Sequence, residues 1–152
     1  MEKIQFSLGR DAIQFDINGQ PFKVAKGLND IESESIRYKK LDALALENII
    51  YRVEEILEQL KFDYKIQRVA DTFDEFMQQL SEQFFNNETV IDRIKLEHAF
   101  NEFVEHTEYY VQQHSSGHFY LFVYFIFIRE MMHHWNVVEI RVGKKSNFTI
   151  NT

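Results

Sequence analysis

Three side chains that could act on a phosphate group lie close together at the end of an aromatic segment: Arg129, His133 and His134. An arginine can stabilise the negative charge of a phosphorane, and a histidine can move a hydroxyl proton near neutral pH. On a helix, Arg129 and His134 would point about 140° apart, whereas His133 would lie on the face of Arg129. The alternative is structural: Arg129 pairs with an acid such as Glu130, and the histidines contact carbonyl groups at a helix end.

Arg129, the four residues after it and His134 together resemble the Arg-x(4–6)-His motif of HEPN-domain ribonucleases. The resemblance covers six residues. It implies a metal-independent ribonuclease that uses Arg129 with His134 or His133, within a helical bundle that dimerises. A predicted strand follows the motif directly, and an N-terminal sheet that the family does not require precedes it. This ribonuclease is the alternative function that the sequence leaves open.

A second group of residues has the spacing of metal ligands. His98, Glu102 and His106 recur every four residues within a predicted helix, so all three would project from one side and could hold a first-row metal ion. The same side carries Lys95 and Glu105 and lies away from the apolar stripe of that helix. A solvated face is therefore the competing interpretation, and no cofactor is predicted.

The negative charge of the chain is concentrated in one stretch. Residues 71–108 hold ten acidic and two basic side chains, whereas the whole chain has a net charge of −7. Such a surface is expected to face a positively charged partner or to repel nucleic acid and anionic membranes. The acidic residues predicted to contact a partner are Asp74, Glu75, Glu82, Asp92, Glu97, Glu102, Glu105 and Glu108.

These features predict a non-catalytic protein-binding module. Its proposed role is that of an acidic inhibitor or immunity-type protein that neutralises a basic partner such as a nuclease toxin. Phosphate-binding glycine motifs, a Gly-x-Ser-x-Gly elbow and a His-Glu-x-x-His motif are all absent from the sequence. The pI of about 5.4 and the lack of a basic stripe argue against direct binding of nucleic acid. A solubilising role of the acidic face is the competing interpretation.

Composition predicts one soluble domain spanning residues 1–152. The chain is 45% apolar and has no cysteine, which excludes disulfides and fits a reducing cytoplasm. Its N-terminus has no apolar core of signal-peptide length, so secretion by that route is not expected. The longest apolar run, residues 119–128, is about half the length needed to span a bilayer.

Turn signals and alternation predict a three-stranded antiparallel meander in the first 26 residues. Asn18-Gly19 favours a type I′ hairpin that pairs Phe15 with Phe22, and Gly9-Arg10 favours a two-residue turn that pairs Phe6 with Ile13. One face of this meander is apolar and must be covered by helices.

A period of 3.6 predicts helices over about 35–60, 71–85 and 89–113, with Asp71 as a helix cap. Residues 118–135 favour a buried helix over a buried strand, because good helix formers continue the run. Residues 138–142 alternate as a strand that joins the meander, and a turn at 143–146 and a strand at 148–150 follow. The predicted fold is α+β, a meander plus a C-terminal strand packed on three to four helices.

Overall fold

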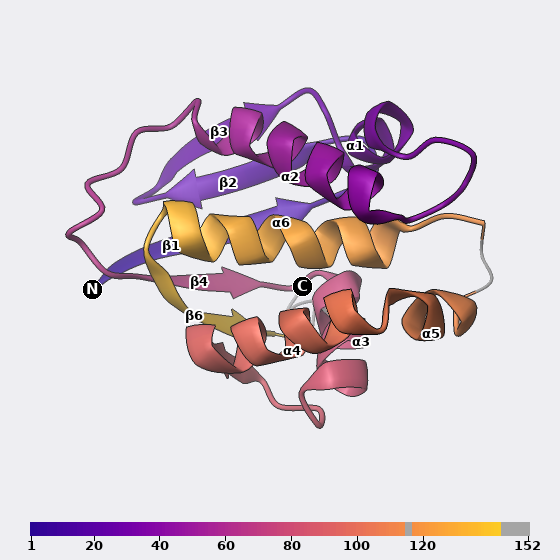
Figure 1. Cartoon of the computed structure of the whole chain (residues 1–152). Helices are drawn as coiled ribbons and strands as arrows, with labels where there is room; N and C mark the ends of the chain where they lie inside the picture. The colour runs from indigo at the N-terminus through magenta and orange to yellow at the C-terminus, as the bar shows by residue number, and fades with distance from the viewer. Residues whose placement is uncertain (115–116, 144–152) are drawn as a thin grey trace, which may run out of the picture.

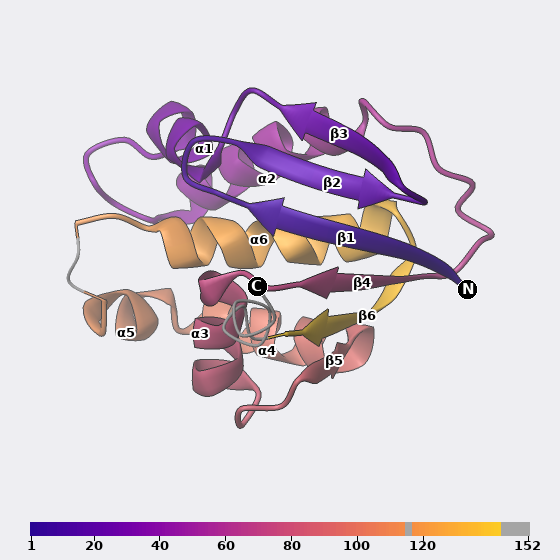
Figure 2. The same ribbon diagram turned by 180° about the vertical axis from the view of Figure 1, so that it is seen from behind.

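The computed structural model describes residues 1–114 and 117–143, and its strands form one mixed sheet in the order β3-β2-β1-β4-β6-β5 (Figures 1 and 2). Strands β1, β4 and β6 run parallel to one another, whereas β2, β3 and β5 are antiparallel to their neighbours. The strands are β1 (Glu2–Leu8), β2 (Ile13–Ile17), β3 (Gln20–Val24), β4 (Arg68–Thr72), β5 (Val90–Asp92) and β6 (Val137–Val142).

Helices pack against one face of this sheet, and α6 occupies the middle of the helical layer between α2 and α4 (Figure 1). Seen from behind, β1, β2 and β3 have no helix in front of them (Figure 2). The helices in the described ranges are α1 (Leu28–Ser35), α2 (Ala43–Leu57), α3 (Glu75–Phe84), α4 (Arg93–Glu105), α5 (Thr107–Gln112) and α6 (Tyr120–His134).

The central helix α6 is apolar on all sides because every side of it is covered. Its eight residues from Leu121 to Ile128 are all buried. At its C-terminal end, Trp135 packs edge-on against Phe15 and Phe62, each with ring centroids 4.7 Å apart. The helix predicted over this segment is therefore confirmed. None of the helices in the described part of the chain is both long and apolar enough to cross a membrane.

The N-terminal meander is confirmed, with one register correct and one wrong. Phe15 pairs with Phe22 as predicted. Phe6, however, pairs with Phe15 and not with Ile13, because the hairpin loop contains four residues, closed by a hydrogen bond from Gly9 N to Ala12 O. A slip of two residues keeps every side chain on its own face, so the apolar alternation could not distinguish the two registers.

The α+β class is confirmed, but the sheet is larger than predicted and the helices are more numerous. Strands β4 and β5 were missed, and β6 pairs with these two strands and not with the meander. Asp71 lies within β4, so it does not cap a helix. The first predicted helix, over about 35–60, corresponds to the shorter α2, and α1 before it was missed. The third predicted helix is β5 followed by α4 and α5. The predicted strand at 148–150 and most of the predicted turn before it lie outside the described residues.

Candidate functional site at the carboxyl ends of β1 and β4

Asp74 lies where two adjacent parallel strands end. Strand β4 ends at Thr72, which is in register with Phe6 of β1, and β1 ends two residues later at Leu8. Asp74 lies two residues after the end of β4 and is the N-cap residue of α3. Ligand sites in open α/β sheets form outside the carboxyl ends of the strands, which makes this edge the first place to look for chemistry.

Hydrogen bonds fix the Asp74 carboxylate from three sides. Its Oδ2 atom accepts from Leu8 N and from the Tyr124 hydroxyl, both at 2.9 Å, and its Oδ1 atom accepts from Ser7 Oγ at 3.2 Å. The Asp74 backbone N–H donates to Thr72 Oγ1 at 3.1 Å. Elements β1, β4 and α6 therefore position this one carboxylate together.

Tyr124 acts in this network only as a neutral donor. Its side chain is fully buried in α6, and burial together with the neighbouring Asp74 charge raises its pKa well above the ordinary value of 10.0. The phenol hydroxyl therefore keeps its proton at physiological pH and holds the carboxylate in one orientation.

The Asp74 and Ser7 side chains border a hollow of about 310 Å³ on the helix-free side of the sheet. Within the described part of the chain its lining includes two carboxylates, one hydroxyl and two amides, but no lysine or arginine. The residues that line it are Gln5, Phe6, Ser7, Gln14, Asp16, Phe73 and Asp74. Such a set of oxygen atoms suits a ligand that brings its own positive charge.

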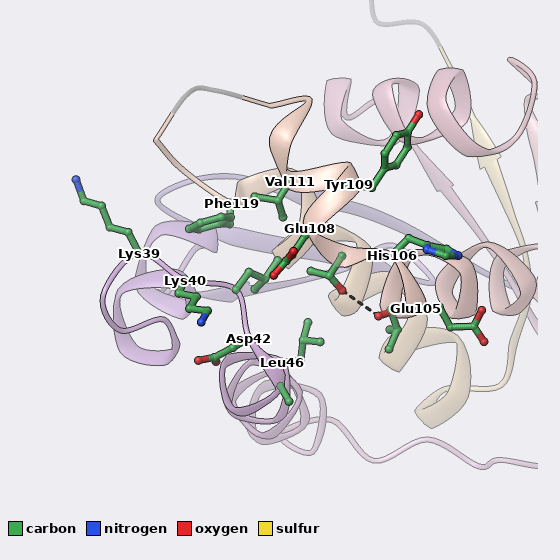
Figure 3. Close-up of a pocket in the computed structure, with 14 residues that line it drawn as sticks. Lys39, Lys40, Asp42, Leu46, Glu105, His106, Glu108, Tyr109, Val111 and Phe119 are labelled. Atoms are coloured by element: carbon green, nitrogen blue, oxygen red, sulfur yellow. Dashed lines mark hydrogen bonds between the residues drawn. The ribbon is translucent and has the colours of Figure 1, made fainter.

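A larger hollow of about 630 Å³ lies between the loop that precedes α2 and the α4–α5 junction (Figure 3). Leu46, Val111 and Phe119 supply its apolar lining. Lys39 points outward from it (Figure 3), and Thr107 Oγ1 donates to the Val104 carbonyl at 3.1 Å. Its charged groups have both signs and are mostly exposed, and they do not converge on one point.

The three predicted catalytic residues are engaged by carboxylates. Arg129 donates to Glu97 at 3.0 Å and to Glu130 at 2.6 Å. His133 also contacts Glu97, at 3.1 Å, so it shares the face of Arg129 as helical spacing predicts. His134 lies on another side, 3.6 Å from Glu54 and 3.8 Å from Glu130. The fold is built on a sheet and is not the helical bundle that the HEPN resemblance implies, so that expectation of the fold is wrong.

The predicted metal ligands are only partly brought together. His106 and Glu102 lie 3.9 Å apart, and together with Glu105 their ligand atoms form an exposed group that does not include His98. Helix α4 ends at Glu105, and His106 leaves helical geometry with φ −129° and ψ 39°. The regular spacing therefore stops before the last of the three residues.

The eight predicted partner-binding acids do not form one free surface. Asp74 is held by the network described above, Asp92 caps α4 by accepting from Lys95 N, and Glu97 pairs with Arg129. The remaining five are exposed: Glu75, Glu82, Glu102, Glu105 and Glu108. Binding of a basic protein by these five residues stays a prediction.

The free energy of unfolding at low pH is expected to depend on the ion pair between Glu97 and Arg129. The hydrogen bond from Arg129, aided by His133, holds the pKa of Glu97 below its ordinary value of 4.5. A carboxyl group whose pKa is lower in the folded state stabilises that state above about pH 4.5, and the effect is lost as the pH falls through the folded value. Glu97→Gln should therefore lower the free energy of unfolding by about 1 kcal/mol at pH 7, and by progressively less below pH 4.5.

Urea denaturation at a series of pH values measures this difference. The exposed Glu105→Gln is the matched control, and it should follow the wild-type curve at every pH. A constant gap between Glu97→Gln and wild type down to pH 2 would contradict the prediction.

Ser7 and Tyr124 were not predicted as site residues, and Asp74 was predicted to lie on a partner-binding surface. A usable signal was present, because Thr72 and Asp74 flank the end of a strand and would have marked a site once β4 was recognised. That strand carries two charged residues in five, and its burial depends on the Arg68 ion pair with Glu2.

No protein-family model matches the sequence, and neither does any curated protein. Several solved structures share the fold of this chain. One is a PPX-GPPA enzyme from Aquifex aeolicus, which aligns with 100% of this chain at a TM-score of 0.67 and 9% sequence identity. The Ppx/GppA family member from the same organism has a TM-score of 0.69, 9% identity and 99% coverage. A type II variant of the Ppx/GppA phosphatase has a TM-score of 0.64, 9% identity and 99% coverage.

This chain spans between 55% and 57% of the length of those three structures. At 9% identity the likeness establishes the fold. It also overturns the prediction of a non-catalytic inhibitor or immunity-type protein, because the proteins that share this fold are described as enzymes. That prediction relied on charge pattern and size, which do not determine the fold.

Proposed function

We propose that this protein is an enzyme that hydrolyses phosphate esters or anhydrides, with Asp74 as its general base. The observation that carries the proposal is the fixed Asp74 carboxylate, which borders a solvent-open hollow at the carboxyl ends of β1 and β4. The fold that the chain shares with Ppx/GppA phosphatases supports the same reaction class.

The charge of the hollow selects the form of the substrate. Asp16 and Asp74 both line it, and its described lining contains no lysine or arginine. A bare polyphosphate or nucleotide would be repelled by two carboxylates, whereas its Mg²⁺ complex carries compensating positive charge. The substrate is therefore the magnesium complex of a phosphate ester or anhydride.

Asp74 can take a proton from a water molecule that enters the hollow. The water oxygen then bonds to phosphorus, the bridging phosphorus–oxygen bond breaks, and the leaving oxygen takes a proton from solvent. Ser7 and Tyr124 position the base through their hydrogen bonds to its two oxygen atoms. Neither residue needs to change its protonation state.

Asp74→Asn is expected to reduce phosphate release by about 100-fold or more, because a general base typically contributes 10²-fold to 10⁴-fold. The assay measures phosphate released from polyphosphate, a nucleoside triphosphate and an aryl phosphate, with MgCl₂ and again with EDTA. Removal of Mg²⁺ should abolish the activity. The exposed Glu47→Gln, on the outer side of α2, is the matched control and should retain full activity.

Ser7→Ala tests whether Ser7 only positions the Asp74 base or is itself the nucleophile. Loss of one positioning hydrogen bond should reduce activity less than about 10-fold. If Ser7→Ala is as inactive as Asp74→Asn while both remain folded, the serine is the nucleophile and the assignment of water as the attacking group is wrong. If wild-type protein releases no phosphate from any of the three substrates, the proposed function is wrong.

A further inference from the structure

A group of three potential metal ligands joins α2 to α6, at the opposite end of α6 from the hollow beside Asp74. Glu130 and His134 stand one helical turn apart on α6, and Glu54 faces them from α2. One ligand atom from each of the three lies within 4.8 Å of the other two. Helices α2 and α6 pack side by side (Figure 1).

The ligand atoms of this group face one another without being bonded to one another. His134 Nε2 lies 3.6 Å from Glu54 Oε2 and 3.8 Å from Glu130 Oε1, both beyond hydrogen-bond distance. Metal bonds of about 2.0–2.2 Å to nitrogen and oxygen place tetrahedral ligands about 3.3–3.6 Å apart. The two histidine–glutamate distances are thus within a few tenths of an ångström of those in a metal site, and side-chain rotation would bring the Glu54 and Glu130 atoms, which lie within 4.8 Å of each other, into the same range.

Charge at this site is out of balance. Three carboxylates gather here, from Glu54, Glu97 and Glu130, and Arg129 is the only arginine or lysine in the described residues that pairs with any of them. The Glu130 side chain is only 6% exposed, so solvent screens its charge poorly. A bound cation would neutralise the carboxylates that Arg129 leaves uncompensated.

A neighbouring contact already orients the most buried ligand. Arg129 Nη1 donates to Glu130 Oε2 at 2.6 Å, which leaves Oε1 directed toward His134. Partners of this kind, which fix a ligand without touching the metal, are a regular feature of metal sites. Arg129 therefore positions a ligand, which accounts for one of the residues that the HEPN resemblance assigned to catalysis.

We propose that Glu54, Glu130 and His134 bind a first-row divalent transition-metal ion such as Zn²⁺, with water completing its coordination. The imidazole nitrogen favours such an ion over Mg²⁺ or Ca²⁺, which take oxygen ligands. The ion links α2 to α6, and the partial exposure of Glu54 and His134, 36% and 34%, leaves a path for its entry. This site is independent of the proposed hydrolytic site.

Titration of the metal-free protein with ZnCl₂ in a calorimeter tests the proposal. One Zn²⁺ ion per chain is expected, with affinity reduced at least 100-fold in His134→Ala and at least 10-fold in Glu54→Gln. His106→Ala is the matched control, because it removes the histidine of the exposed Glu102, Glu105 and His106 group and should leave the affinity unchanged. Co²⁺ should give visible absorption bands that His134→Ala abolishes.

The proposal would be overturned by the absence of saturable Zn²⁺ or Co²⁺ binding, or by binding that His134→Ala and Glu54→Gln leave intact. A variant could also lose binding because it misfolds. Paramagnetic broadening of the wild-type NMR spectrum by Co²⁺ therefore locates the ion without any variant. Signals of residues 54, 130 and 134 should broaden first. Broadening centred on residues 102–106 would reject the site.

Discussion

Arg68→Met is expected to lower the free energy of unfolding by about 3–5 kcal/mol, because Arg68 is a buried cation with every contact made inside the protein. The side chain is only 2% exposed. Its Nε atom donates to Glu2 Oε1 at 2.7 Å. The guanidinium also lies 4.4 Å from the centre of the Phe62 ring.

The cost comes mainly from the groups that would lose their partner. Arg68 Nη1 donates to the backbone carbonyls of Asp63, Ile66 and Trp135 at 3.0–3.2 Å. Methionine fills a similar volume but donates no hydrogen bond, so the Glu2 carboxylate would lose its charged partner and the Trp135 carbonyl would lose the hydrogen bond from Arg68. The Asp63 and Ile66 carbonyls would each keep one donor, Ile66 N and Asn136 Nδ2. Arg68 thus ties the start of β4 to β1, to the loop before β4 and to the end of α6.

Urea denaturation followed by the fluorescence of Trp135, the single tryptophan, measures the effect. Arg141→Met is the matched control, because Arg141 lies on β6, is 52% exposed and, among the described residues, pairs with Glu139 of the same strand. That change should alter stability by less than about 0.5 kcal/mol. Equal losses in the two variants would show that burial of Arg68 has no special weight.

Gly27→Ala is expected to destabilise the protein by about 3 kcal/mol through a backbone collision. A Cβ atom at residue 27 would stand 2.3 Å from the Arg10 carbonyl oxygen. Here the N-terminus of α1 rests on the β1–β2 hairpin, with Leu28 N and Asn29 N donating to the carbonyls of Gly9 and Arg10 at 2.9 Å. Moving the hairpin aside would lengthen both hydrogen bonds.

Gly19→Ala is the comparison variant, because it places a Cβ atom on a backbone with positive φ but causes no steric collision. Gly19 has φ +82°, and a Cβ atom added there would meet no other atom within 4 Å. A left-handed conformation costs a residue with a Cβ atom about 1 kcal/mol. Gly27→Ala should therefore be clearly less stable than Gly19→Ala in thermal or urea unfolding. The reverse order would show that no collision occurs at residue 27.

The sequence was sufficient to predict those elements whose backbone geometry depends on one short segment. Asn18 has φ 53° and Gly19 has φ +82°, the combination that a type I′ turn requires, so this hairpin and its register could be read from two residues. The continuous apolar run of α6 could likewise be assigned to a helix from the residues that extend it. Both assignments depend on neighbours in the sequence.

Long-range pairing could not be predicted in the same way. Strand β4 reads Arg-Val-Ala-Asp-Thr, and its burial depends on Glu2 for the charge of Arg68 and on β1 and β6 for its backbone. No local pattern encodes those partners. The candidate site depends on this strand, so Asp74 could be placed beside Ser7 and Tyr124 only after the sheet was known.

The central position of α6 has a consequence for synthesis on the ribosome. Strands β1 and β4 lose most of their apolar cover if residues 120–134 are missing, and β4 has no partner on its other side until β6 emerges at Val137–Val142. The first hundred or so residues therefore leave the exit tunnel with the apolar faces of β1 and β4 incompletely covered. Chaperone binding to the nascent chain should be strongest in that interval and should end once α6 docks.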